Sequence, residues 1–241
     1  HVSLDLVYSM GSMQCAVQAS AVVKYTVTVV MIPLMVAIVL TILHLALVRC
    51  GQKQFRCLLL GRTLGTLAML FFISLLSSAL EPFYCDQHPS GLWTMQAYPN
   101  VVCDFKEGHL QMCIVACIVC LVPITFMAVS LRLVLVDLPM RIQRAEVNFI
   151  SACSFLILRF RPGLEVFSLV FLGRNVLITL APLISSQAGS LLVMNLALYM
   201  TLCGTALYQP WRARTANDLD LAMHLGLLLV IFLGNFFAVD R

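Results

Sequence analysis

The sequence LQMCIVACIVCLVPITFMAVSLRLVLV, at Leu110–Val136, decides the fold of this chain. It is about 27 residues long and contains a single charged residue, Arg132. A helix of about 20 residues, rising 1.5 Å per residue, crosses a hydrocarbon core about 30 Å thick. The stretch therefore predicts a membrane-spanning helix.

Five further apolar stretches are long enough for the same role. The six predicted spans are Val23–Val48, Cys57–Leu80, Leu110–Val136, Leu164–Ile184, Ser190–Tyr208 and Leu219–Phe236. Hydrophobic residues make up 61% of the chain and charged residues 11%, against about 45–50% and about 25% in soluble domains. We therefore predict an all-α fold, a polytopic membrane helical bundle with six transmembrane helices. It forms a single domain over residues 23–241, after a lead-in segment over residues 1–22.

The basic residues predict the orientation of this bundle. Those in the connections between spans 1 and 2, 3 and 4, and 5 and 6 are Arg49, Lys53, Arg56, Arg62, Arg132, Arg141, Arg144, Arg159, Arg161, Arg212 and Arg214. The opposite side holds Lys24, Lys106 and Arg241. Because basic loops face the cytoplasm, both termini are expected on the non-cytoplasmic side. The net charge of +4 thus reflects topology and does not indicate a nucleic-acid partner.

The longest outer connection, residues 81–109, contains two cysteines. Its proline, glycine and aromatic residues indicate a structured cap. Cys85 and Cys103 can close a loop in an oxidising compartment, a stabilisation of about 3 kcal/mol. Two free thiols are the alternative, favoured if the membrane is intracellular. A metal site that includes His88 and His109 is a further alternative, although these residues lack a recognised ligand spacing.

The inner connection between spans 3 and 4 contains a second apolar segment. Residues 149–160 are too few to cross a bilayer and are flanked by arginines, so they predict an interfacial helix on the inner leaflet. The arginines expected to contact lipid headgroups here and in the last inner connection are Arg141, Arg144, Arg159, Arg161, Arg212 and Arg214. Anionic headgroups attract such residues.

Span 4 contains the most unusual charge, Arg174, about 15 Å from the inner end of the span if it begins at Leu164. A central arginine costs at least about 2.5–3.5 kcal/mol unless it faces protein or water. The expected partner by depth is Asn195, followed by Asn175, and no acid lies at a matching depth. Two interpretations stay open. Arg174, Asn175 and Asn195 line a ligand or ion site, or Arg174 ties helices together through hydrogen bonds.

Two further patterns lie within the spans. Gly61 and Gly65 form a GxxxG pattern, which either lets another backbone approach or arises by chance. Cys113, Cys117 and Cys120 share one face of span 3, where cysteines are usually small packing residues rather than metal ligands.

Motifs for enzymatic chemistry were not found in the sequence. It has no phosphate-binding loop, GxSxG, HExxH or dinucleotide fingerprint. His44 and His224 could in principle ligate a haem or a chlorophyll magnesium, but lone histidines more often serve packing. We therefore predict a protein that is not an enzyme, with no cofactor and no metal site.

Three loose motifs connect the chain to a known family. They are Cys85, Pro89, Gly91 and Cys103 ahead of His109; Arg161-Pro162 followed by Arg174-Asn175; and Tyr208-Gln209-Pro210-Trp211 followed by Asn217-Asp218-Leu219. On these residues, about half of the chain resembles the membrane domain of TRP-like proteins of fungi and of cysteine-rich protist surface proteins. The resemblance implies a channel- or transporter-like bundle, often C-terminal to a larger ectodomain. The chain lacks a selectivity-filter loop between its last two spans.

The leading hypothesis is a non-enzymatic, TRP-like channel- or transporter-like membrane domain. The alternative is a structural membrane anchor or an accessory subunit of a larger complex. Expected partners are the lipid bilayer, other membrane subunits and a larger ectodomain, of which this chain, beginning at His1, would be a processed part. The plasma membrane is the expected location.

Overall fold

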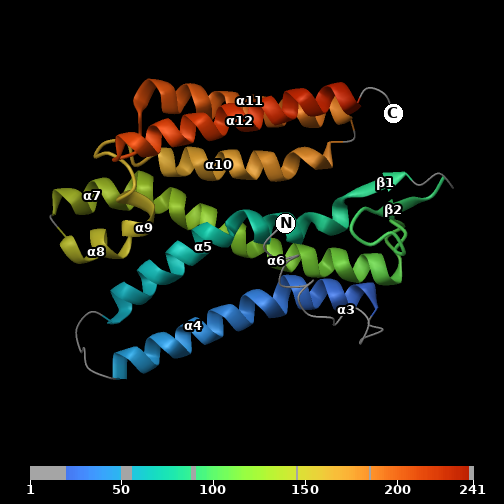
Figure 1. Cartoon of the computed structure of the whole chain (residues 1–241). Helices are drawn as coiled ribbons and strands as arrows, with labels where there is room; N and C mark the ends of the chain where they lie inside the picture. Colours follow the sequence, from blue (N-terminus) through green and yellow to red (C-terminus); the bar gives the residue numbers. More distant parts are fainter. Residues whose placement is uncertain (1–19, 50–55, 88–90, 145, 185, 239–241) are drawn as a thin grey trace. The chain divides into compact units, whose positions relative to one another are not determined.

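A computed structural model describes residues 20–49, 56–87, 91–144, 146–184 and 186–238 (Figure 1). The described elements are α3 (Ala21–Thr26), the π-helical turn η1 (Val27–Met31), α4 (Ile32–Arg49), α5 (Arg56–Leu80), the 3-10 turn η2 (Glu81–Phe83), β1 (Cys85–Gln87), β2 (Trp93–Met95), α6 (Glu107–Arg132), the π-helical turn η3 (Leu133–Asp137), α7 (Leu138–Gln143), α8 (Val147–Ala152), α9 (Ser154–Ile157), α10 (Phe167–Leu180), the 3-10 turn η4 (Ala181–Leu183), α11 (Gln187–Tyr208) and α12 (Arg214–Ala238). Most of the predicted lead-in segment, residues 1–19, lies outside the described part.

Five of the described helical segments are long and apolar enough to cross a membrane. They are Ala21–Val39, Gly61–Phe83, Gly108–Gln143, Gln187–Tyr208 and Arg214–Gly234. The predicted fourth span is shorter than expected, because α10 begins only at Phe167 and its last turn is the 3-10 turn η4, which contains Pro182. The structure therefore supports a helical membrane protein with five long apolar helices, and six spans are not confirmed.

The chain divides into two compact units, and the single domain expected from the sequence stays a prediction. The first consists of His1–Ile42 and Ser74–Pro123, and the second of Leu43–Ile73 and Ile124–Arg241. In the first unit, Tyr25 is fully buried and its hydroxyl donates a hydrogen bond to the carbonyl of Ala79 (3.2 Å). Met95, Met112, Ala116, Val119, Ala79 and Val29 pack around it.

The outer connection, residues 81–109, forms the structured cap that its composition predicts. Strands β1 and β2 pair antiparallel, with Cys85 opposite Met95. A disulfide joins Cys85 to Cys103, with a Cα–Cα distance of 6.4 Å. This pairing confirms the predicted disulfide. The two strands were not expected in an all-α fold, and they form because backbone groups outside helices must pair with one another.

Within the second unit, α10, α11 and α12 run side by side (Figure 1). Ser186 caps α11 by accepting a hydrogen bond from the backbone amide of Gly189 (3.2 Å). Gln209 ends α11 in the left-handed conformation, with φ at 45°. Gly163 has φ at 88° in the turn before α10, a conformation that glycine adopts without steric cost.

The interfacial helix predicted over residues 149–160 is wrong in its extent. The segment forms two short helices, α8 and α9, which meet at Cys153 (φ −85°, ψ 8°). Helix α9 ends at Ile157, and Phe160 instead forms an antiparallel bridge with Trp211. Pairing with a distant connection has therefore replaced the last helical turn. Cys153 is buried, and this burial raises the pKa of its thiol.

The two glycines of the GxxxG pattern differ in their surroundings. A Cβ atom at Gly65 would overlap the ring of Phe155 from α9, whereas a Cβ at Gly61 would meet nothing within 4 Å. Helix packing through this pattern is thus found at Gly65, against a side chain rather than a helix backbone. Gly61 takes no part in it among the described residues.

We expect Gly65→Ala to destabilise the protein by about 1–3 kcal/mol, because the ring of Phe155 must move to admit the methyl group. Gly61→Ala is the matched control and should be neutral or stabilising by up to about 1 kcal/mol, since alanine favours a helix over glycine. Thermal unfolding in detergent, followed by circular dichroism, measures both. Equal effects of the two substitutions would contradict the packing of Phe155 on Gly65.

Candidate functional site

Arg174 on α10 contacts three side chains of the second unit. Its Nε and Nη2 donate hydrogen bonds to Oδ1 of Asn175, at 3.2 and 3.1 Å. Its Nη1 lies 2.7 Å from Nε2 of His224 on α12. The guanidinium carbon also lies 5.1 Å from the centre of the Phe171 ring. Every guanidinium nitrogen of Arg174 therefore has a protein partner.

The hydrogen bonds of His224 determine its tautomer. The side chain is 2% exposed, and Nδ1 lies 2.7 Å from the backbone carbonyl of Asp220. Because a carbonyl only accepts, Nδ1 carries the proton and donates it. Nε2 then has a lone pair and accepts from Arg174. A neutral imidazole is the state that fits both contacts, since a second proton on Nε2 would face a donor of Arg174.

Two threonines of α11 complete this network. The hydroxyl of Thr205, which is fully buried, donates to Oδ2 of Asp220 (3.0 Å). The hydroxyl of Thr201 lies 3.0 Å from Nε2 of His224 and also bonds to the carbonyl of Ala197. We call the set Arg174, Asn175, Thr201, Thr205, Asp220 and His224 the Arg174 cluster. It connects all three helices α10, α11 and α12 through polar contacts.

An acid lies in this cluster, contrary to the sequence-based expectation for Arg174. Oδ1 of Asp220 is 3.6 Å from Nδ1 of His224. The carboxylate of Asp220, the imidazole of His224 and the guanidinium of Arg174 thus lie next to one another in that order. The four-residue spacing of Asp220 and His224 on one helix face was a signal in the sequence that could have pointed to them.

Asn195 is not the partner of Arg174 that its depth predicted. Its Nδ2 donates to the backbone carbonyl of Leu191 on its own helix (2.9 Å), and no hydrogen bond joins it to Arg174 in the described structure. Asn195 instead lines an open groove of about 710 Å³ on α11 and α12, together with Ala188, Leu191, Leu192, Leu196, Tyr199 and Leu228. The groove is apolar and does not include Arg174.

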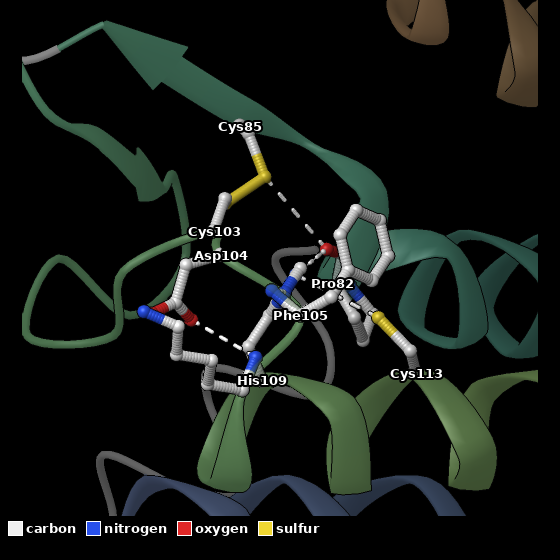
Figure 2. The surroundings of a disulfide bond; sticks show 8 residues. Pro82, Cys85, Cys103, Asp104, Phe105, His109 and Cys113 are labelled. Atoms are coloured by element: carbon white, nitrogen blue, oxygen red, sulfur yellow. Dashed lines mark hydrogen bonds and ion pairs between the residues drawn. A yellow bond between two sulfur atoms is a disulfide. The ribbon is translucent and has the colours of Figure 1, made fainter.

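The outer cap contains a second group of reactive side chains (Figure 2). His109 is 3% exposed, with Nε2 3.0 Å from the carbonyl of Pro82 and Nδ1 accepting from the amide of Phe105 (3.2 Å). The Sγ atom of Cys113 lies 3.6 Å from Nε2. A cavity of about 230 Å³ adjoins the disulfide and His109. Burial, reinforced by the charge of Glu81, raises the pKa of the nearby Tyr84 to about 12.

The potential metal ligands of this cap are engaged in other bonds. The ligand atoms of Cys85, Cys103 and His109 lie within 4.8 Å of one another. Both thiols form the disulfide, and both ring nitrogens of His109 have backbone partners. His88 and the side chain of His44 lie outside the described part of the structure. Cys113, Cys117 and Cys120 are free thiols.

The six predicted headgroup arginines fall into two groups. Arg141 is engaged within the protein, since Nη1 lies 2.8 Å from Oε2 of Glu146 and the guanidinium lies 4.2 Å from the centre of the Phe149 ring. The other five have exposed or half-exposed side chains. They are Arg144, Arg159, Arg161, Arg212 and Arg214.

Comparisons of this chain with protein-family models, with curated proteins and with solved structures found no match. The TRP-like resemblance therefore stays a prediction that depends on its three motifs.

Proposed function

We propose that this chain is an integral membrane protein with a structural role, as a membrane anchor or accessory subunit whose last three helices are tied together by the Arg174 cluster. One observation carries this role. Nε, Nη1 and Nη2 of Arg174 are all occupied by Asn175 or His224. Three of the five N–H groups of the guanidinium are thereby used within the protein, as in an arginine that ties helices together.

The exposed surface supports a membrane position. Large apolar side chains are exposed along the long helices, among them Leu70, Ile118, Leu192, Met200, Leu207 and Val230. Soluble proteins rarely expose apolar patches of this extent. In our proposal lipid or a neighbouring subunit covers these faces, and α10 with η4 crosses the bilayer as a sixth span. The basic inner connections then direct both termini to the non-cytoplasmic side.

A transport function, as implied by the TRP-like resemblance, is the second candidate. The series Asp220, His224 and Arg174 favours it, because ionisable groups inside membrane helices often mark ion or proton pathways. Such a function requires water to reach the cluster. The described groove beside Asn195 is lined mainly by leucine and does not include Arg174, so we rank this candidate second.

Reconstitution of the purified protein into liposomes separates the two functions. For the structural role we expect fluxes of K⁺, Cl⁻ and protons equal to those of empty liposomes, and a lower thermal stability of Arg174→Gln. A flux above that of empty liposomes, abolished in Arg174→Gln and kept in Asn195→Leu, would establish transport instead. Release of the protein from membranes at alkaline pH would overturn the membrane assignment itself.

A further inference from the structure

Two inner connections, distant in the sequence, are joined by backbone hydrogen bonds. The amide of Arg161 donates to the carbonyl of Pro210 (2.8 Å), and the amide of Arg212 donates to the carbonyl of Arg159 (3.1 Å). Phe160 and Trp211 form the antiparallel bridge between them. The side chain of Asn217 holds Trp211 in place, because Oδ1 accepts from its amide (3.0 Å) and Nδ2 donates to its carbonyl (3.1 Å).

This pairing brings two aromatic rings together. The rings of Phe160 and Trp211 lie on one face, with centres 5.1 Å apart, and Phe171 of α10 packs on both. The residues that flank these two rings along the chain are Arg159, Arg161 and Arg212. Phe160 is buried, while Arg159 and Arg212 are exposed and Arg161 is half-exposed.

The resulting arrangement is electrostatically unfavourable by itself. Arg159 and Arg212 lie directly opposite each other across the pairing, where like charges are destabilising. Arg214 begins α12, at the helix end where the dipole disfavours a cation. Elsewhere in the described structure Arg132 and Arg141 have carboxylate partners. No ion pair neutralises Arg159, Arg161, Arg212 or Arg214 among the described residues.

We propose that Arg159, Arg161, Arg212 and Arg214 bind the phosphomonoester headgroup of an anionic phospholipid. A phosphomonoester carries nearly two negative charges and three acceptor oxygens, which match guanidinium groups that donate in pairs. Arg159, Arg161 and Arg212 flank the pairing of Phe160 with Trp211, and Arg214 begins α12. Tyr208, which ends α11, lies three residues before Trp211 in the chain. Tryptophan and tyrosine are enriched at the headgroup level of membranes. This inference rests on the proposed membrane position.

The test uses the purified protein in lipid nanodiscs of three compositions. One contains phosphatidylcholine alone, one adds phosphatidic acid, and one adds phosphatidylserine at matched surface charge. We expect phosphatidic acid to raise the melting temperature more than phosphatidylserine does. Equal effects of the two anionic lipids would overturn the phosphomonoester assignment. Glycerol 3-phosphate, added to phosphatidylcholine discs, presents the same phosphomonoester without a lipid. If it raises the melting temperature as much as phosphatidic acid does, the conclusion that the bound group belongs to a lipid is overturned.

The variant Arg159→Gln/Arg212→Gln should lose the phosphatidic acid effect, with an affinity about tenfold weaker or more. Its melting temperature in phosphatidylcholine discs should equal or exceed that of the parent, because like-charge repulsion is removed. Arg132→Gln, which removes one positive charge outside this pairing, is the control and should keep the effect. Arg159→Lys/Arg212→Lys keeps the charge and should lose the preference for the phosphomonoester.

Retention of the preference for phosphatidic acid in the glutamine variant would overturn the proposal. A failure of the headgroup proposal can be distinguished from a failure of the proposed function. A protein that enters nanodiscs but shows no lipid preference contradicts only the headgroup site, whereas a protein released from membranes at alkaline pH contradicts the membrane assignment.

Discussion

Substitution of His224 by leucine is expected to destabilise the protein by about 2–4 kcal/mol. Leaving a donor without its acceptor costs about 1–3 kcal/mol, and more when the donor is charged, as the guanidinium of the half-exposed Arg174 is. The loss arises because Nη1 of Arg174 no longer has its acceptor at 2.7 Å. Reversible unfolding in detergent measures the free energy.

A double-mutant cycle tests whether the loss of the contact between Arg174 and His224 causes this destabilisation. Arg174→Met/His224→Leu removes both partners and should cost less than the sum of the single substitutions, with a coupling of about 1–3 kcal/mol. Asn195→Leu is the matched control, because Asn195 bonds to its own helix, and its effect should stay within about 0.5 kcal/mol. Additive costs of the two substitutions would show that Arg174 and His224 do not stabilise each other.

Removal of the disulfide with Cys85→Ser/Cys103→Ser should cost about 3 kcal/mol. The bond closes a loop with a sequence separation of 18, and the entropy that it removes from the unfolded chain sets this magnitude. Cleavage by a protease within residues 81–109 should also become faster, because β1 and β2 are short strands. Thermal unfolding and limited proteolysis measure the two effects.

The free thiol Cys117 provides the control for this experiment. Cys117→Ser removes an exposed sulfur of the same first unit without opening a loop. It should leave both the unfolding temperature and the proteolysis rate close to those of the parent. If the double serine variant matches Cys117→Ser in both measurements, the disulfide does not stabilise the cap.

Much of the candidate site could not be predicted from the sequence. Arg174 was identified because a charge within an apolar run is conspicuous. Its partner His224 is 50 residues away, and an apolar helix gives no pattern that shows which of its faces meets which neighbour. Asn195 has a matching depth, but its side chain bonds to its own helix and lines the groove instead of contacting Arg174. Depth alone therefore selected the wrong partner.

The sequence by itself determined the apolar helices, and it indicated a disulfide of the outer cap that the structure then confirmed. Both follow from local properties, because a long apolar run satisfies its backbone within its own helix and the cap contains two cysteines. Only the tertiary structure decided that His224 meets Arg174 and that Phe160 pairs with Trp211. These contacts join residues far apart in the chain, and they depend on how helices and connections pack in three dimensions.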